Sequence, residues 1–164
     1  MAGEEEMILA VLVLVTSAAL CIFYLQVTCQ NILRREFDRE FFKSIANANR
    51  LEFVFVRRSL EEFDTPVDYP WVRLALKCDY LALTYLLKNA ANSKRAYSRE
   101  ERLLMLYFRT LFLVLAVFHV FNISEKSAIL RLTAILQYFA NILGERVSHV
   151  RFGNLTASEY LLGL

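Results

Sequence analysis

Histidine and cysteine side chains are few in this chain, and their spacing limits the chemistry that they could carry. The two histidines, His119 and His149, belong to no HExxH, CxxCH or ExxH pattern. The sequence therefore predicts no zinc site, covalent haem or di-iron site. Cys21, Cys29 and Cys78 lack metal-ligand spacing, and an odd number without a CxxC pair does not fit a disulfide framework.

His119 is the one candidate for contact with a cofactor such as haem or a pigment. It follows a long apolar run, and a ligating imidazole needs a second-shell partner that the letters alone do not show. A histidine hydrogen-bonded in a helical core is the plainer interpretation. His149, beside Val150 and Arg151 at a predicted helix end, is expected to contact the negative end of the helix dipole.

Other arrangements of reactive residues also have structural explanations. Lys77 and Asp79 interrupt an apolar stretch, and with Arg109 they could form a buried ion network between helices. The serines have no GxSxG context, and four glycines provide no phosphate-binding loop. We therefore predict no catalytic residue, no bound cofactor and no small-molecule substrate, so the chain is expected not to be an enzyme.

Composition favours an all-α protein that contacts lipid or other subunits. Apolar residues make up 57% of the 164 residues, while Gly 4 and Pro 2 leave few residues for turns. Thirteen Phe and eight Tyr exceed what a core of this size commonly needs, so part of this surface is expected to face lipid or a partner. A net charge of +2 from mixed signs gives no reason to expect nucleic acid.

The segment from Met7 to Val27 is predicted to be a transmembrane helix. It has 21 residues without a charge, and only Thr16, Ser17 and Gln26 are polar. At 1.5 Å per residue it covers about 30 Å, the thickness of the bilayer hydrocarbon. A cleaved signal peptide is the alternative, but it has a positive n-region and a shorter apolar stretch, whereas Glu4–Glu6 precede this run.

Positive charges on one side of this span predict its orientation. None precedes it, and four follow within about 16 residues: Arg34, Arg35, Arg39 and Lys43. The N-terminus is expected outside and the remainder in the cytoplasm, at a plasma or inner membrane. We predict an anchor over residues 1–29, a juxtamembrane helical region over 30–65 and a helical bundle domain over 66–164, with about four to five helices after the anchor.

The first part of the predicted cytoplasmic region has recognisable helix signals. The LEFVFV run that begins at Leu51 is rich in β-formers, but without a second strand to pair with it is predicted to be helical. Pro70 fits the first turn of the next helix with Asp68 as its cap. Ser98 and Glu101 form a capping-box pattern at the start of another helix.

The apolar stretch from Leu103 to Phe121 has two interpretations. Beyond Thr110 it is apolar on every side until His119, so it is either a helix buried in the bundle or a second membrane span. Arg109 lies inside the run, and an arginine costs about 2.5 to 3.5 kcal/mol at a bilayer centre. This cost favours the buried helix without excluding the span.

The C-terminal part is predicted to contain an amphipathic helix and a short terminal helix. Ser124 is expected to cap the first, with Glu125 in its opening turn and with Ile129 to Leu143 on its apolar face. This helix is expected at the edge of the bundle, with polar residues on its surface: Arg131, Asn141, Glu145 and Arg146. Gly153-Asn154 is predicted to make a turn before the last helix.

These features lead to three functional hypotheses. The first is a non-catalytic accessory, structural or assembly subunit of a larger membrane protein complex, whose partners are the lipid bilayer and other membrane subunits. The second is a subunit that contacts haem or a pigment through His119 in an electron-transfer complex. The third is a membrane-tethered regulatory adaptor.

Overall fold

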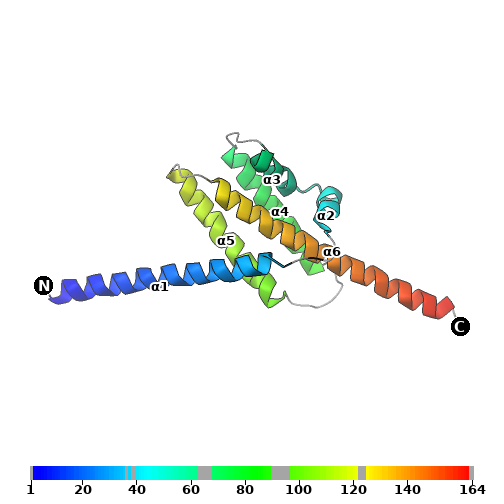
Figure 1. Cartoon of the computed structure of the whole chain (residues 1–164), viewed down its shortest axis with the longest axis horizontal. Helices are drawn as coiled ribbons and strands as arrows, with labels where there is room; N and C mark the ends of the chain where they lie inside the picture. Colours follow the sequence, from blue (N-terminus) through cyan, green and yellow to red (C-terminus); the bar gives the residue numbers. More distant parts are fainter. Residues whose placement is uncertain are drawn as a thin grey trace. The chain divides into compact units, whose positions relative to one another are not determined.

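The computed structural model of this chain is helical throughout (Figure 1). It describes residues 2–35, 37, 40–62, 68–89, 97–121 and 125–162, with side chains only between residues 6 and 148. Within these ranges there are six helices and no strand, which confirms the all-α prediction. The chain divides into two compact units, Met1–Arg35 and Glu36–Leu164. The six helices are α1 Ala2–Leu33, α2 Phe42–Asn49, α3 Phe53–Glu62, α4 Tyr69–Asn89, α5 Arg99–Val120 and α6 Lys126–Leu162.

Helix α1 forms the first unit, and its side chains have the properties of a membrane span. Its segment Glu6–Leu33 is 28 residues long with a mean hydropathy of 2.7. The side chains from Glu6 to Tyr24 are all exposed. Thr16 donates its hydroxyl to the Leu12 carbonyl at 2.8 Å, so this polar group is satisfied inside the helix and needs no partner from lipid.

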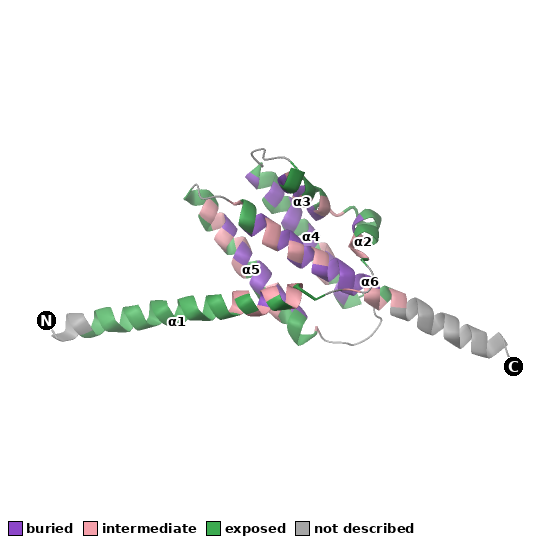
Figure 2. Cartoon of the chain, viewed as in Figure 1, coloured by how far each residue is buried: buried purple, intermediate pink, exposed green. Residues whose placement is uncertain are grey.

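Two further helices are long and apolar enough to cross a membrane. They are Arg99–Val120 in α5 and Lys126–Ser148 in α6. In an apolar stretch of 18 residues within each, 28% of the residues in α5 and 72% of those in α6 are buried inside the protein. Length and composition therefore allow more than one span. The two segments differ in what covers their apolar surface, because α6 is covered mainly by other helices of the protein and α5 is not (Figure 2).

Helix α6 is the centre of the second unit, and the prediction that it lies at the bundle edge is wrong. It packs against α2, α3, α4 and α5, and its residues from Ala128 to Gly144 are buried or half-buried all round. Asn141, predicted to be on the surface, is 3% exposed. The apolar stripe seen in the sequence is wider in the folded protein because small or uncharged residues such as Thr133 and Ala140 are buried between the larger ones.

Helix α6 also continues farther than the sequence indicates. It runs through Gly153 and Asn154 to Leu162, so the predicted turn and the separate terminal helix are wrong, and His149 lies within the helix instead of at its end. Glycine costs about 1 kcal/mol in a helix interior, and a single such residue does not have to end a helix. Glu125 precedes the first turn of α6, while Ser124 lies outside the described residues.

Helices α4 and α5 both pack on α6, and the side-chain contacts between α4 and α5 show that they run in opposite directions. Aromatic rings join them: Tyr80 and Phe108 stack with centroids 4.2 Å apart, and Arg73 lies over the Phe112 ring at 5.4 Å. The predicted capping box is confirmed, because the Ser98 hydroxyl and the Glu101 carboxylate each accept a backbone N–H of the other residue.

The short helices α2 and α3 are capped by side chains from distant helices. The backbone amides of Phe41 and Phe42 donate to Asn141 Oδ1 of α6 at 2.9 and 2.8 Å, so Asn141 caps the start of α2. Asp79 of α4 accepts the Phe53 amide at 2.7 Å and caps α3 in the same way. The run from Phe53 forms helix α3, as predicted.

Gly144 is required where α6 passes the segment that leads into α2. A Cβ atom at position 144 would overlap Cβ and Cγ of Phe41, which are close to the backbone and have little freedom to move. We expect Gly144→Ala to destabilise the second unit by about 1 to 3 kcal/mol, more than the gain in helix propensity. Thermal unfolding of the purified chain measures this effect. Phe41→Gly removes both of these atoms, so Gly144→Ala should cost less in a Phe41→Gly background than in the native chain. An equal cost in the two backgrounds would contradict this explanation.

Candidate functional site

The predicted ion network of Lys77, Asp79 and Arg109 does not form. Lys77 and Arg109 are exposed on α4 and α5, whereas Asp79 is 4% exposed and faces α3. Its carboxylate accepts the Phe53 amide at the start of α3. A sequence cannot show which side chain will reach a distant helix end, so this role of Asp79 was missed.

Burial of Asp79 has an electrostatic consequence. Removal from water raises the pKa of the Asp79 carboxyl from 3.8 to about 6, because the loss of hydration outweighs the hydrogen bonds from the Phe53 and Glu52 amides, which act in the opposite direction. Between these two pH values the folded state holds the proton more tightly than the unfolded state. The contribution of Asp79 to stability therefore falls as the pH rises from about 4 to about 6.

Asp79→Asn should remove this dependence, because the amide cannot titrate while its oxygen still accepts the Phe53 N–H. Relative to the native chain, we expect the variant to gain about 2 kcal/mol in unfolding free energy between pH 4 and pH 8. Thermal unfolding across this pH range is the measurement. The matched control is Asp68→Asn, an exposed position before α4. Native and Asp79→Asn profiles that run parallel would contradict the assignment.

His119 lies at the end of α5, where two contacts account for its position. Its ring stacks on Tyr69 with centroids 3.7 Å apart, and its Nδ1 is 2.8 Å from Glu125 Oε1. These contacts join the end of α5 to the starts of α4 and α6. The His119 side chain is half exposed, so it is not the core histidine that the sequence predicted.

The other predicted site residues do not gather into a site. Cys21 and Cys78 are exposed on different helices, and the side chain of His149 lies outside the described residues. In the part of the chain with described side chains, no group of three or more His, Cys, Asp or Glu could hold a metal ion.

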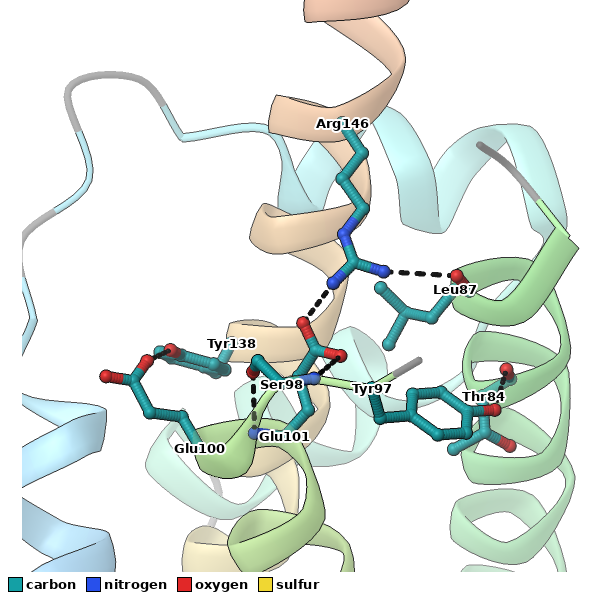
Figure 3. Close-up of polar contacts among 8 residues, drawn as sticks. All are labelled: Thr84, Leu87, Tyr97, Ser98, Glu100, Glu101, Tyr138 and Arg146. Carbon is teal, nitrogen blue, oxygen red and sulfur yellow. Dashed lines mark hydrogen bonds and ion pairs between the residues drawn. The ribbon is translucent and has the colours of Figure 1, made fainter. Parts of the chain in front are cut away.

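Arg146 is at the centre of a polar cluster that positions α4 and α5 (Figure 3). Its guanidinium extends from α6, pairs with Glu101 in the capping box of α5, and donates to the Leu87 carbonyl near the end of α4 at 3.1 Å. The Glu101 side chain is 4% exposed and that of Arg146 is 25% exposed. The Arg146 guanidinium therefore binds a backbone carbonyl near the end of α4 and a carboxylate at the start of α5 at the same time.

Two tyrosines extend this cluster (Figure 3). Tyr97, just before α5, donates its hydroxyl to the Thr84 carbonyl of α4 at 3.1 Å, and burial raises the pKa of Tyr97, which keeps that hydroxyl protonated. Tyr138 of α6 donates to Glu100 at 3.1 Å. These hydrogen bonds connect neighbouring helices. The Glu100 and Glu101 carboxylates both already accept hydrogen bonds from groups of the protein.

The outward side of α4 combines large apolar residues with cations. Leu74, Leu81 and Tyr85 are 62%, 55% and 68% exposed. They recur at spacings of seven and four, so they share one side of the helix. Arg73, Lys77 and Lys88 are exposed beside them.

The outward side of α5 has the same character. Leu106 and Leu113 are 53% and 69% exposed, and Val117 and Val120 continue the same line. Arg102 and Arg109 are exposed between these residues at spacings of three and four. We call the residues of these two lines, together with the exposed cations beside them, the α4–α5 face: Leu74, Leu81, Tyr85, Leu106, Leu113, Val117, Val120, Arg73, Lys77, Lys88, Arg102 and Arg109.

Charge is distributed unequally between this face and α3. On α4 and α5 the acidic residues are Asp79 and Glu101, which are buried, and Glu100, which is exposed at the start of α5 and accepts the Tyr138 hydroxyl. On α3, by contrast, each cation is paired with an acid four residues later: Arg57 with Glu61 and Arg58 with Glu62. The α4–α5 face is therefore basic and apolar, whereas α3 is balanced in charge.

The spacing of apolar and basic residues on α4 and α5 is visible in the sequence, but only their burial in the structure shows which of them are exposed. The apolar run of α5 was expected to be covered by protein or to cross lipid, and the structure leaves one side of it uncovered. Comparisons with protein-family models, curated proteins and solved structures found no match for this chain.

Proposed function

We propose that this chain is a non-catalytic accessory or assembly subunit of a membrane protein complex, held in the bilayer by α1. The observation that carries the proposal is α1 itself. It has no charged side chain after Glu6, and its residues from Met7 to Tyr24 are exposed on every side. Apolar surface of this extent is stable in hydrocarbon and not in water.

A single span is the arrangement that the other apolar helices support best. Most of the apolar surface of the α6 segment Lys126–Ser148 is covered by α2 to α5, so this segment has no need of lipid. The outward side of α5 includes Arg109, and this exposed Arg would cost about 2.5 to 3.5 kcal/mol near a bilayer centre. The proposed topology has α1 as the span and α2 to α6 outside the hydrocarbon.

The cations that follow α1 favour a cytoplasmic location for the second unit. Arg34 and Arg35 come directly after the helix, whereas Glu4, Glu5 and Glu6 lie at its other end. Because positive charges close to a span remain on the cytoplasmic side, the N-terminus is proposed to lie outside.

Exposed aromatic surface supports a role in assembly. Phe55 of α3 and Trp71 of α4 are 59% and 40% exposed and meet edge to face, with centroids 6.1 Å apart. Exposed aromatic groups of this kind are enriched in protein interfaces. We propose that neighbouring subunits contact the chain at this pair and along α1.

Mild detergent extraction followed by size-exclusion chromatography tests the assembly role. The native chain should elute in a complex with other membrane proteins, and Phe55→Ser with Trp71→Ser should reduce the partners recovered by about tenfold or more. The matched control is Arg58→Ser, an exposed α3 position. A native chain that elutes alone as a monomer would contradict the proposal.

A cofactor-contacting role is the second candidate, and the His119–Glu125 pair is the observation in its favour. A ligating imidazole commonly donates its second nitrogen to a carboxylate, as His119 can do toward Glu125. The stack on Tyr69 explains the same position without a ligand. A visible absorbance band in the purified complex that is lost in His119→Ala would favour this role.

A further inference from the structure

We infer that the α4–α5 face docks on the surface of a bilayer that contains anionic lipid. The first step of the argument is composition. The face has seven exposed large apolar side chains and five cations, without an exposed acid among them. Surfaces that lie in the headgroup region combine these two features, because the apolar side chains enter the acyl boundary while the cations contact phosphate.

Charge complementarity selects the occupant. A neutral apolar partner would leave Lys77, Arg109 and the other cations desolvated without counter-charge, which is costly. Anionic headgroups supply diffuse negative charge that can match cations spread along two helices. A second copy of this chain would bring like charges together at the same face.

Connection to the anchor is the second argument, and it rests on the proposed function. Helix α1 ends at Leu33 and α2 begins at Phe42, so a short segment joins the proposed span to the second unit. A surface held this close to a bilayer meets lipid at a high effective concentration. Weak contacts from single side chains are then sufficient for docking.

Fluorescence quenching in the full-length chain tests this inference. Trp71 is the only tryptophan, so a Trp71→Phe background allows one new tryptophan to be placed on the face at Leu113 or, as the control, on α3 at Arg58, whose side chain is 73% exposed. The chain is reconstituted into nanodiscs of phosphatidylcholine with or without about one third phosphatidylserine, with bromine near the headgroup end of the acyl chains.

The expected result is stronger quenching at Leu113→Trp than at Arg58→Trp, and only in the anionic nanodiscs. Adding Lys77→Gln and Arg109→Gln should lower the ratio of docked to undocked chain by about tenfold or more, given the effect of each cation near an anionic surface. Arg57→Gln with Arg58→Gln on α3 is the matched control and should leave that ratio unchanged.

Three results would overturn the inference. Equal quenching at the two positions in anionic nanodiscs would show that the face does not select the bilayer. Quenching at Leu113→Trp in neutral nanodiscs by bromine at the bilayer centre would show that α5 crosses the membrane. Protection of the same position by an acidic partner protein, without lipid quenching, would assign the face to that partner.

The same sample separates this inference from the proposed function. Resistance of the chain to alkaline carbonate washing reports insertion of α1, independently of the tryptophan signal. An inserted chain with unquenched Leu113→Trp contradicts docking alone, whereas a chain released by carbonate contradicts the anchor.

Discussion

Arg146→Met is expected to lower the unfolding free energy of the second unit by about 3 to 5 kcal/mol, since it leaves a buried carboxylate without its partner. Glu101 is almost fully buried, and the same substitution also removes the donor to the Leu87 carbonyl. Thermal or denaturant unfolding of the chain in mild detergent, followed by far-UV circular dichroism, measures the loss.

Two further variants distinguish the buried pair from a general effect of removing a cation. Arg58→Met breaks an exposed pair with Glu62 and should cost less than about 1 kcal/mol. Glu101→Gln combined with Arg146→Met removes the unpaired charge and should recover part of the stability. A loss for Arg146→Met as small as that for Arg58→Met would contradict the proposed role of the cluster in Figure 3.

Leu14→Arg combined with Ala18→Arg is expected to release the chain from the membrane. The two arginines cost about 5 to 7 kcal/mol near the bilayer centre, which cancels the roughly 4 to 7 kcal/mol that Leu, Ile, Val and Phe side chains of the span contribute. We expect the carbonate-resistant fraction to fall by about tenfold or more. Quantitative immunoblotting of washed membranes measures this fraction.

Leu14→Ala combined with Ala18→Leu is the matched control, because it changes the same positions and preserves the apolar character of the helix. This control should remain in the membrane fraction. A double arginine variant that resists carbonate as well as the control would show that α1 does not need the hydrocarbon of the bilayer.

Local signals in the sequence predicted several elements of the fold. The uncharged run of α1, the first-turn position of Pro70 and the capping box of Ser98 and Glu101 all depend on residues a few positions apart. Helix propensity and capping act over this same distance, so one sequence is sufficient to recognise them.

Two features could not be predicted in this way: the capping of a helix by a side chain from a distant helix, and which helix is the most deeply buried. Asn141 and Asp79 cap helices that are 99 and 26 residues away in the chain, and polar residues of this kind look like surface residues in a sequence. The sequence also indicated α5 as the more buried helix, because it is the more apolar. The structure has α6 at the centre, since four helices pack around it.

The candidate site was predictable only in part. Apolar and basic residues on α4 and α5 are visible in the sequence, and the aromatic surplus indicated a partner or lipid. Which of them remain exposed depends on the pairing of α4 with α5 through rings such as Tyr80 and Phe108. That pairing is a tertiary property.

Cysteine accessibility tests the central claim most directly. In native membranes, with the other cysteines replaced by Ser, Cys21 in α1 should resist a water-soluble maleimide until detergent is added, because the account places it in hydrocarbon. Arg58→Cys on α3 should react once the cytoplasmic side is opened. Rapid labelling of Cys21 in intact membranes would contradict the anchor.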